Sequence, residues 1–164
     1  MPERFSYAQL EHYGFYIPHD VEEHKPTADY VEYYNVCSHA AATEKDIPGL
    51  VVASFSQDNF FNVAINLANF FYSVFSTSYE KFPRDEDRKI YTSAQLLVLH
   101  SLSPSPPEWQ RNSLISLLSQ RECTRSTTLL HLVANAADQI DPVLLAYLRS
   151  KKKRYFYELI LEEG

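Results

Sequence analysis

Glycine is the residue whose scarcity most constrains this chain. Its 164 residues include only three glycines, Gly14, Gly49 and Gly164. Loops that cradle phosphate groups need clustered glycines, because only a backbone without side chains can approach the ligand closely. The sequence contains neither GxGxxG nor GxxxxGK[ST], which excludes the standard nucleotide-binding loops. Tight β-hairpins also need residues with positive φ, so an all-β fold is disfavoured and helix is the default expectation.

Composition and charge narrow the class of protein further. Apolar residues make up 45% of the chain and aromatic residues 14%, which is typical of a globular protein with a real core. The net charge of −6 disfavours general nucleic-acid binding, which needs a positive surface. Cys37 and Cys123 lie far apart, no CxxC pair predicts a zinc site, and no secretory signal opens the chain. We therefore expect free thiols in a cytoplasmic or nuclear protein.

The most apolar window, residues 60–75, is too short to span a membrane and contains three asparagines. It predicts instead a buried central helix over residues 58–79, starting at Asp58 as N-cap. Asn62, Asn66 and Asn69 would form a narrow polar stripe on this helix, directed to solvent or to a polar contact. Further helices are predicted over residues 92–102, 107–120, 128–137 and 141–154.

Two short segments favour extended structure. Residues 30–36 are rich in β-forming types and predict a short strand. Residues 51–55 either pair with that strand or lead directly into the central helix. The expected fold is therefore mainly α, with a short N-terminal arm that is irregular or β. The arm would comprise residues 1–50, and residues 51–164 would form a helical domain that docks a substrate or partner.

Residues 7–18, YAQLEHYGFYIP, contain Leu10, Tyr13, Gly14 and Phe15 in a pattern that resembles the end of a SET domain. The pattern N-x-x-L-L-x-x-Y-G-F closes the catalytic region in protein-lysine methyltransferases of the Rubisco-methyltransferase type, and a helical docking region follows it. The resemblance implies that Tyr13 is a catalytic residue lining the methyl-transfer channel, where its hydroxyl would orient the substrate amine.

The same comparison implies that this chain is catalytically incomplete. Tyr7 stands where the family has asparagine, and Glu11 stands where it has a second leucine. The glycine-rich strand and the N-H-x motif that bind S-adenosylmethionine in SET proteins are both missing. No cofactor is therefore expected on this chain, although S-adenosylmethionine would serve a full SET protein.

Residues 128–134, TLLHLVA, offer an alternative. Thr128, Leu130, His131 and Ala134 resemble the T-P-L-H-x-A-A opening of an ankyrin repeat, in which threonine and histidine tie the turn. This resemblance implies a non-enzymatic helical adaptor or scaffold with an ankyrin-like C-terminal segment. The competing interpretation makes His131 an ordinary hydrogen-bonded core residue.

A basic run near the C-terminus contrasts with the acidic chain. Five cations fall within six residues, and they are Arg149, Lys151, Lys152, Lys153 and Arg154. One interpretation is a partner-binding patch for an anionic protein surface. The other is a solvated helix end, where cations complement the helix dipole.

The predicted function is that of a helical docking region of a SET-type methyltransferase, with the helical adaptor as the alternative. Both interpretations imply a protein partner or protein substrate, without nucleic acid or membrane. No metal is expected, because His19 and His24 are five residues apart and do not share a helix face.

Overall fold

A five-stranded sheet forms the centre of the computed structural model, which describes residues 5–18, 27–78 and 88–162. All strand pairs are parallel, and the strands lie in the order β2-β3-β4-β1-β5. In chain order the strands are β1 (Gly49–Ala53), β2 (Val74–Ser78), β3 (Leu96–Leu102), β4 (Thr127–Leu132) and β5 (Phe156–Leu161).

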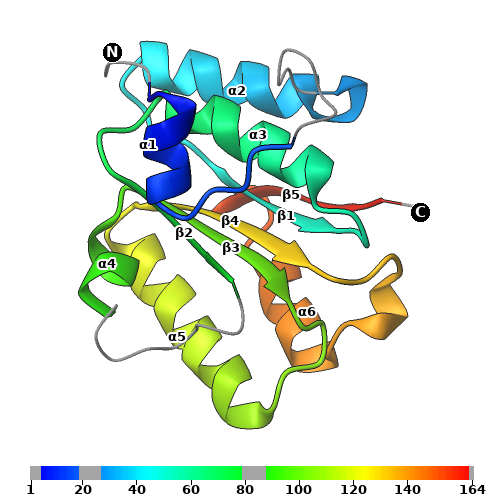
Figure 1. The fold of residues 1–164 in the computed structure, drawn as a ribbon. Coiled ribbons are helices and arrows are strands. Elements are labelled where there is room, and N and C mark those ends of the chain that lie inside the picture. Colours follow the sequence, from blue (N-terminus) through cyan, green and yellow to red (C-terminus); the bar gives the residue numbers. More distant parts are fainter. Residues whose placement is uncertain (1–4, 19–26, 79–87, 163–164) are drawn as a thin grey trace.

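Helices cover both faces of this sheet (Figure 1). One face carries α1 (Tyr7–His12), α2 (Val31–Ala42) and α3 (Asp58–Ala68), and the other carries α4 (Arg88–Ser93), α5 (Glu108–Cys123) and α6 (Pro142–Ser150). Two short 3-10 turns, Ala28–Tyr30 and Ala137–Gln139, complete the described secondary structure. The result is a three-layer α/β fold, so the expectation of a mainly α fold was wrong.

The central strands β1, β3 and β4 are buried on both faces, and this explains the error. Along β1, Leu50 and Val52 belong to the core under α1, α2 and α3, whereas Val51 and Ala53 belong to the core over α5 and α6. Strands buried on both sides read as continuous apolar runs without alternation. Such a run cannot be distinguished from a buried helix by periodicity alone.

Two predicted helices are strands for this reason. The helix predicted over residues 92–102 is the end of α4 followed by β3, whose first four residues are all buried. The helix predicted over residues 128–137 is β4, in which all six residues are buried, followed by a loop. The converse error occurs at residues 30–36, which form the end of the 3-10 turn and the start of α2 and not a strand. Residues 51–53 belong to β1, which pairs with β4 and β5, and residues 54–55 lead out of it toward α3.

The central helix begins within one residue of its predicted start, but Asp58 is not its N-cap, and the helix ends early. α3 starts at Asp58, with Gln57 in the N-cap position, and ends at Ala68, so residues 74–78 are free to form β2. The polar stripe does not face solvent throughout. Asn62 is fully buried, and neither its side-chain oxygen nor its nitrogen has a hydrogen-bond partner among the described residues.

The two helices with clear end signals are confirmed. α5 starts directly after Pro107, and α6 starts at Pro142. The Asp141 carboxylate accepts a hydrogen bond from the Leu144 amide at 3.0 Å, and this bond lowers the pKa of Asp141. Pattern and local chemistry agree at these helix starts, which is why the sequence predicted them correctly.

Glycine is required where two backbones approach most closely. A Cβ on Gly14, whose φ is +95°, would lie 2.0 Å from the Ser76 carbonyl oxygen of β2. A Cβ on Gly49 would lie 2.1 Å from the Thr128 oxygen of β4. Gly14 and Gly49 therefore allow the close backbone approaches beside β2 and β4. The predicted division at residue 50 stays a prediction, although Leu10 and Phe15 share one core with Leu50.

The two cysteines are free thiols. Cys37 is buried in α2, where desolvation raises its pKa to about 12, and Cys123 is exposed at the end of α5.

A buried arginine joins α4, α5 and β4. Arg121 is 0% exposed, and its Nε donates to the Thr128 hydroxyl at 2.8 Å. Its two terminal nitrogens donate to the Tyr91 carbonyl at 2.7 Å and to the Thr127 carbonyl at 2.8 Å. These acceptors are neutral, and burial lowers the pKa of the guanidinium. The side chain therefore acts as a hydrogen-bonding cross-brace.

We expect Arg121→Met to destabilise the fold by about 3 kcal/mol or more, because three buried acceptors would lose their donor. Arg125→Met is the matched control, since Arg125 is 77% exposed and should cost at most about 1 kcal/mol. Urea denaturation of both variants measures the difference. Equal losses of stability would show that Arg121 is not a brace.

Candidate functional site

The sheet changes its winding direction between β1 and β4. The chain leaves β1 toward α3 on one face and leaves β4 toward α6 on the other face (Figure 1). Open parallel sheets bind ligands in the crevice outside the carboxyl ends of the strands at such a switch point. A ligand site is therefore expected at residues 54–57, which follow β1.

A buried histidine fills this switch point. His131 of β4 is 1% exposed, and its Nε2 lies 2.9 Å from the Ser54 hydroxyl and 3.1 Å from the Ser54 carbonyl oxygen. On the other side of the ring, the Ser101 amide donates to Nδ1 at 3.1 Å. The Ser101 hydroxyl in turn donates to Gln57 Oε1 at 3.0 Å. The Phe60 ring packs on the imidazole with a centroid distance of 5.3 Å.

The Ser54–His131 pair has the composition of a nucleophile and base, but its protonation pattern is wrong for that chemistry. Because Nδ1 accepts a hydrogen bond from an amide, the proton of the neutral ring must be on Nε2. Nε2 therefore donates toward Ser54 and has no lone pair to take the serine proton. Burial also lowers the pKa of His131, which keeps the ring neutral.

These contacts settle the role of His131 within the fold. The competing interpretation of His131 as a hydrogen-bonded core residue is confirmed. The histidine lies inside a fully buried strand, not in the turn that opens an ankyrin repeat.

Acidic groups surround the start of α3. Asp58 lies in the first turn of the helix. The Asn59 side chain donates to Glu162 Oε1 at 3.1 Å, and the Tyr30 hydroxyl also donates to this carboxylate. Within the described ranges, no group of three possible ligands could hold a metal ion. The segment that contains His19 and His24 lies outside these ranges.

The structure divides the basic run into members that pair with acids and members that line a cleft, and its partner-binding role stays a prediction. Lys151 Nζ pairs with Glu122 at 2.8 Å, and this bond raises the pKa of Lys151. Lys152 Nζ pairs with Glu158 at 2.8 Å. Arg149 is exposed on α6, outside any described pocket. Two members of the run, Lys153 and Arg154, line a cleft.

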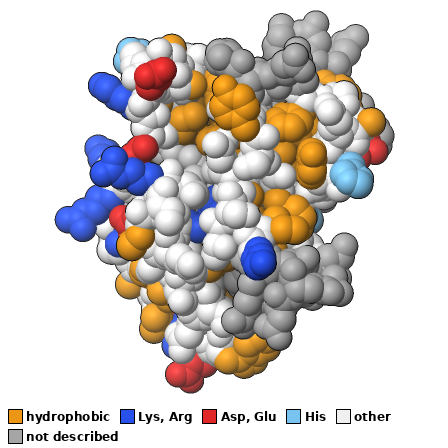
Figure 2. Space-filling view, turned by 90° about the vertical axis from the view of Figure 1, so that its left-hand side faces the viewer, with side chains coloured by type: hydrophobic (Ala, Val, Ile, Leu, Met, Phe, Trp, Pro, Cys, Tyr) orange, Lys and Arg blue, Asp and Glu red, His pale blue; other side chains and the backbone are white. Residues whose placement is uncertain are grey.

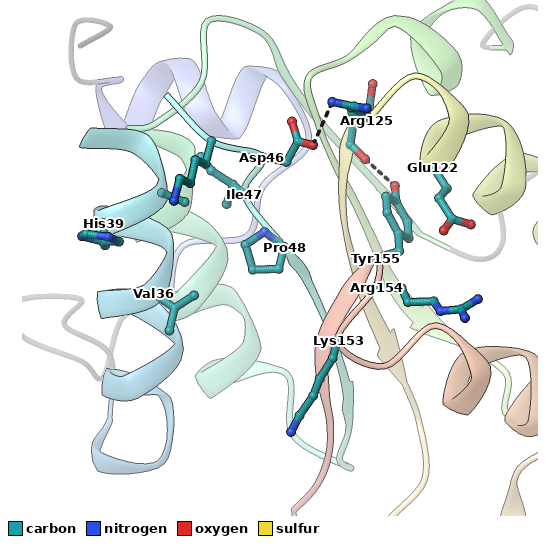
Figure 3. Close-up of a pocket in the computed structure, with 13 residues that line it drawn as sticks. Val36, His39, Asp46, Ile47, Pro48, Glu122, Arg125, Lys153, Arg154 and Tyr155 are labelled. Atoms are coloured by element: carbon teal, nitrogen blue, oxygen red, sulfur yellow. Dashed lines mark hydrogen bonds and ion pairs between the residues drawn. The ribbon is translucent and has the colours of Figure 1, made fainter. Parts of the chain in front are cut away.

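This basic cleft lies where the strands begin, between α2 and the turn that precedes β5 (Figure 3). Its volume is about 650 Å³. Four of its lining side chains are cationic and two are acidic. The lining residues are Val36, His39, Ala40, Lys45, Asp46, Ile47, Pro48, Glu122, Arg125, Ser126, Lys153, Arg154 and Tyr155.

Charge in the basic cleft is only partly compensated. Arg125 pairs with Asp46 at 3.7 Å, and both side chains are well exposed. In the part of the chain that the structure describes, no ion pair joins Lys45, Lys153 or Arg154 to an acid. Figure 2 views this edge of the sheet and shows most Lys and Arg side chains gathered along its left-hand part. The cleft therefore presents free cations to solvent.

Tyr155 forms a rigid wall of the cleft. Its hydroxyl donates to the Ser126 carbonyl and lies 2.6 Å from the Thr128 hydroxyl (Figure 3). Burial raises the pKa of this phenol. The wall is thus neutral and fixed, and it holds the turn that carries Lys153 and Arg154.

Sequence reasoning missed half of these cations. Lys45 follows α2 and Arg125 follows α5, far from the basic run in sequence. They meet because each precedes a strand of the same parallel sheet, and the amino ends of such strands share one edge. An α/β prediction would have grouped them, whereas a helical prediction could not.

Tyr13 lies beside β2, the outermost strand on the side of the sheet away from β5. Its carbonyl accepts a hydrogen bond from the Ser76 amide at 2.8 Å, and its side chain is 39% exposed. Its ring makes edge contacts with Phe5 and His12. The catalytic role predicted for Tyr13 depended on the methyltransferase resemblance alone, and it stays a prediction without further support.

No described helix is long and apolar enough to cross a membrane.

No family model and no curated protein matches this chain. Its fold is similar to several solved structures. The DnaC helicase loader aligns with a TM-score of 0.59 at 11% identity, over 84% of this chain and 93% of that one. The replication initiator DnaA bound to AMPPCP and single-stranded DNA aligns with a TM-score of 0.57 at 14% identity, over 82% of this chain. The RuvB Holliday junction branch migration motor of Thermotoga maritima aligns with a TM-score of 0.52 at 16% identity or less.

This chain spans less than half the length of the DnaA and RuvB chains, namely 47% and 43%. At such identities the likeness shows the fold alone, which is a parallel α/β fold shared with these structures. The neighbours overturn the SET-domain resemblance, and neither a methyltransferase docking region nor an ankyrin adaptor is indicated. The short match to the SET domain is rich in Tyr and Phe, and the fold of the chain does not support it.

The buried histidine predicts a specific pH dependence. The pKa of His131 in the folded state is below its unfolded value near 6.5. At a pH between these two pKa values, the imidazole is protonated in the unfolded chain but not in the folded chain. Stability from this group is therefore lost as pH falls below about 6.5, at up to about 1.4 kcal/mol per pH unit. His131→Gln lacks this titration. Urea denaturation measures the free energy of unfolding of wild type and variant. The difference between the two should shrink from pH 7.5 to pH 5, by up to about 1.4 kcal/mol per pH unit below about pH 6.5. A constant gap would contradict a neutral buried ring.

Proposed function

We propose that this chain is a protein-binding module on a P-loop ATPase-like fold, and that it neither binds nor hydrolyses nucleotide. The observation that carries the proposal is the segment after β1. In this position of the fold, a glycine-rich loop with a lysine would cradle phosphates. Here Ser54, the first residue of this segment, is hydrogen-bonded to the buried His131.

The residues after β1 do not fit a phosphate group. They are Ser54, Phe55, Ser56 and Gln57, without glycine, lysine or arginine. The Phe55 side chain is 58% exposed at a place where the phosphate loop needs bare backbone. No cation of this segment could therefore reach a β- or γ-phosphate.

Two backbone donors at the ends of this segment are engaged within the protein. The Ser54 amide donates to the Leu132 carbonyl at 3.0 Å, and the Asp58 amide donates to the Ser56 hydroxyl at 3.3 Å. Phosphate binding at a helix N-terminus relies on free amide donors and a positive dipole end. Asp58 places a carboxylate in that first turn and would repel a polyphosphate.

Several observations support a protein partner. The neighbours include a helicase loader, a replication initiator and a branch migration motor, and this likeness supports a role beside other proteins. The fold also exposes large apolar side chains on its surface. Among the most exposed are Phe55, Tyr72, Trp109 and Val143. Aromatic side chains of this kind are enriched in protein interfaces.

Calorimetric and thermal titration with Mg–ATP and AMPPCP test the proposal. We expect no binding heat and no rise in Tm. The assay is sensitive, because a ligand present at a concentration equal to its Kd already stabilises a protein by about 0.4 kcal/mol. The AMPPCP-binding DnaA serves as the positive control.

Saturable binding heat, or a rise in Tm that grows with nucleotide concentration, would overturn the proposal. It would mean that the segment after β1 opens, releasing Ser54 from His131. His131→Gln then provides the decisive comparison, because weakening the contact between Ser54 and residue 131 should strengthen nucleotide binding.

A further inference from the structure

We infer that the basic cleft is the docking site for an acidic peptide segment of a partner protein. The inference rests on the proposed function, because it names the surface and the chemistry of that partner. It is carried by the free cations of the cleft, by its apolar wall, and by a second hollow that continues it.

Three cations in the basic cleft have no acidic partner among the described residues. Lys45 reaches it from the end of α2, and Lys153 and Arg154 come from the turn before β5. Lys153 has a φ of +65°, and its amide donates to the Phe156 carbonyl at 2.6 Å. The backbone of this turn is therefore fixed, which holds the cations in place before a ligand arrives. Carboxylates match such groups, and arginine can bind them with two hydrogen bonds.

The fourth cation is held by an exchangeable contact. Arg125 meets Asp46 at 3.7 Å, with side chains that are 77% and 65% exposed (Figure 3). An exposed pair of this kind contributes little stability. A carboxylate from a partner could therefore replace Asp46 at Arg125 with little cost. The Asp46 carboxylate thus occupies the position at Arg125 that a carboxylate of the partner would take.

The cleft continues into an aromatic hollow of about 340 Å³, which shares Lys45, Asp46 and Arg125 with it. Beyond the ion pair, this hollow is lined by Phe70, Phe71 and Tyr72. Tyr72 is 73% exposed. The two hollows together fit an extended segment with several acidic residues beside an apolar one. An acidic run alone would leave these rings uncovered.

A protein segment fits this surface better than single-stranded nucleic acid does. Nucleic-acid grooves combine a long cationic track with aromatic rings on which successive bases stack. Here only four cations meet in the cleft, on a chain with net charge −6. Tyr155, the ring inside the cleft, is buried to 8% exposure with its hydroxyl engaged, so it cannot stack. Tyr72 in the adjoining hollow is well exposed, but one such ring is not a platform for successive bases.

Fluorescence anisotropy on the full chain tests this docking site. The probe is a labelled peptide that alternates acidic residues with leucine, compared with the same peptide carrying Asn and Gln in place of Asp and Glu. A labelled oligothymidine of equal charge is the third probe. We expect the acidic peptide to bind best, and its affinity to fall between low and high salt, because exposed charges are screened within about 10 Å at 0.1 M.

The variant Lys153→Glu/Arg154→Glu should weaken peptide binding by about tenfold or more, since it reverses the charge inside the cleft. Its matched control is Arg149→Glu/Lys152→Glu, which changes the net charge equally from positions outside the cleft lining. Lys45→Glu gives an independent loss from another element. Thermal melts followed by circular dichroism confirm that each variant is folded.

Asp46→Asn provides a change of opposite sign. It removes the carboxylate that competes for Arg125, so we expect peptide binding to strengthen by a few fold. A variant that merely damages the surface would not strengthen binding.

The outcomes separate cleanly. Equal losses in the cleft variant and its control, or no binding of the acidic peptide, would overturn the inference. So would oligothymidine binding more tightly than the peptide and losing affinity in the cleft variant. None of these results bears on the proposed absence of nucleotide binding, which fails only if nucleotide binds.

Discussion

One imidazole ring joins the loops that this fold would otherwise use to hold a ligand. His131 bonds Ser54 after β1 through Nε2 and accepts from the Ser101 amide of β3 through Nδ1. Phe60 of α3 packs on the same ring. The carboxyl edge of the sheet is thus tied across three strands and one helix. Because each ring nitrogen has a partner, opening this edge would leave a buried polar group unsatisfied, which costs about 1–3 kcal/mol.

The two edges of the sheet consequently differ in what they can bind. The carboxyl edge combines the sealed loop with Asp58 and Glu162, so it opposes anions. The amino edge gathers Lys45, Arg125, Lys153 and Arg154 in one open cleft. A chain with a net charge of −6 therefore has a local positive surface, at the edge opposite the one where such sheets usually bind ligands. The fold is similar to that of DnaA bound to AMPPCP, but the exposed charges of the amino edge suit the acidic protein segment that we propose.

Local signals in the sequence predicted local structure well. Asp141-Pro142 and Pro107 marked the starts of α6 and α5 correctly, because capping depends on neighbouring residues alone. The absence of a glycine-rich phosphate loop was also readable from the sequence. The sheet was not, since strands such as β4 are buried on both faces and carry no alternation. The basic cleft could not be assembled for the same reason. Its cations come from three segments that are distant in sequence, and these segments meet only through parallel strand order.

The ring of His131 offers the most direct test that the carboxyl edge is closed. Long-range ¹H–¹⁵N correlation spectra of the native protein distinguish which imidazole nitrogen carries the proton. A sealed edge requires a neutral ring with the proton on Nε2 and an unprotonated Nδ1 that accepts from Ser101. A ring protonated on Nδ1, or a charged ring at neutral pH, would contradict this account, because the contact to Ser101 could not exist.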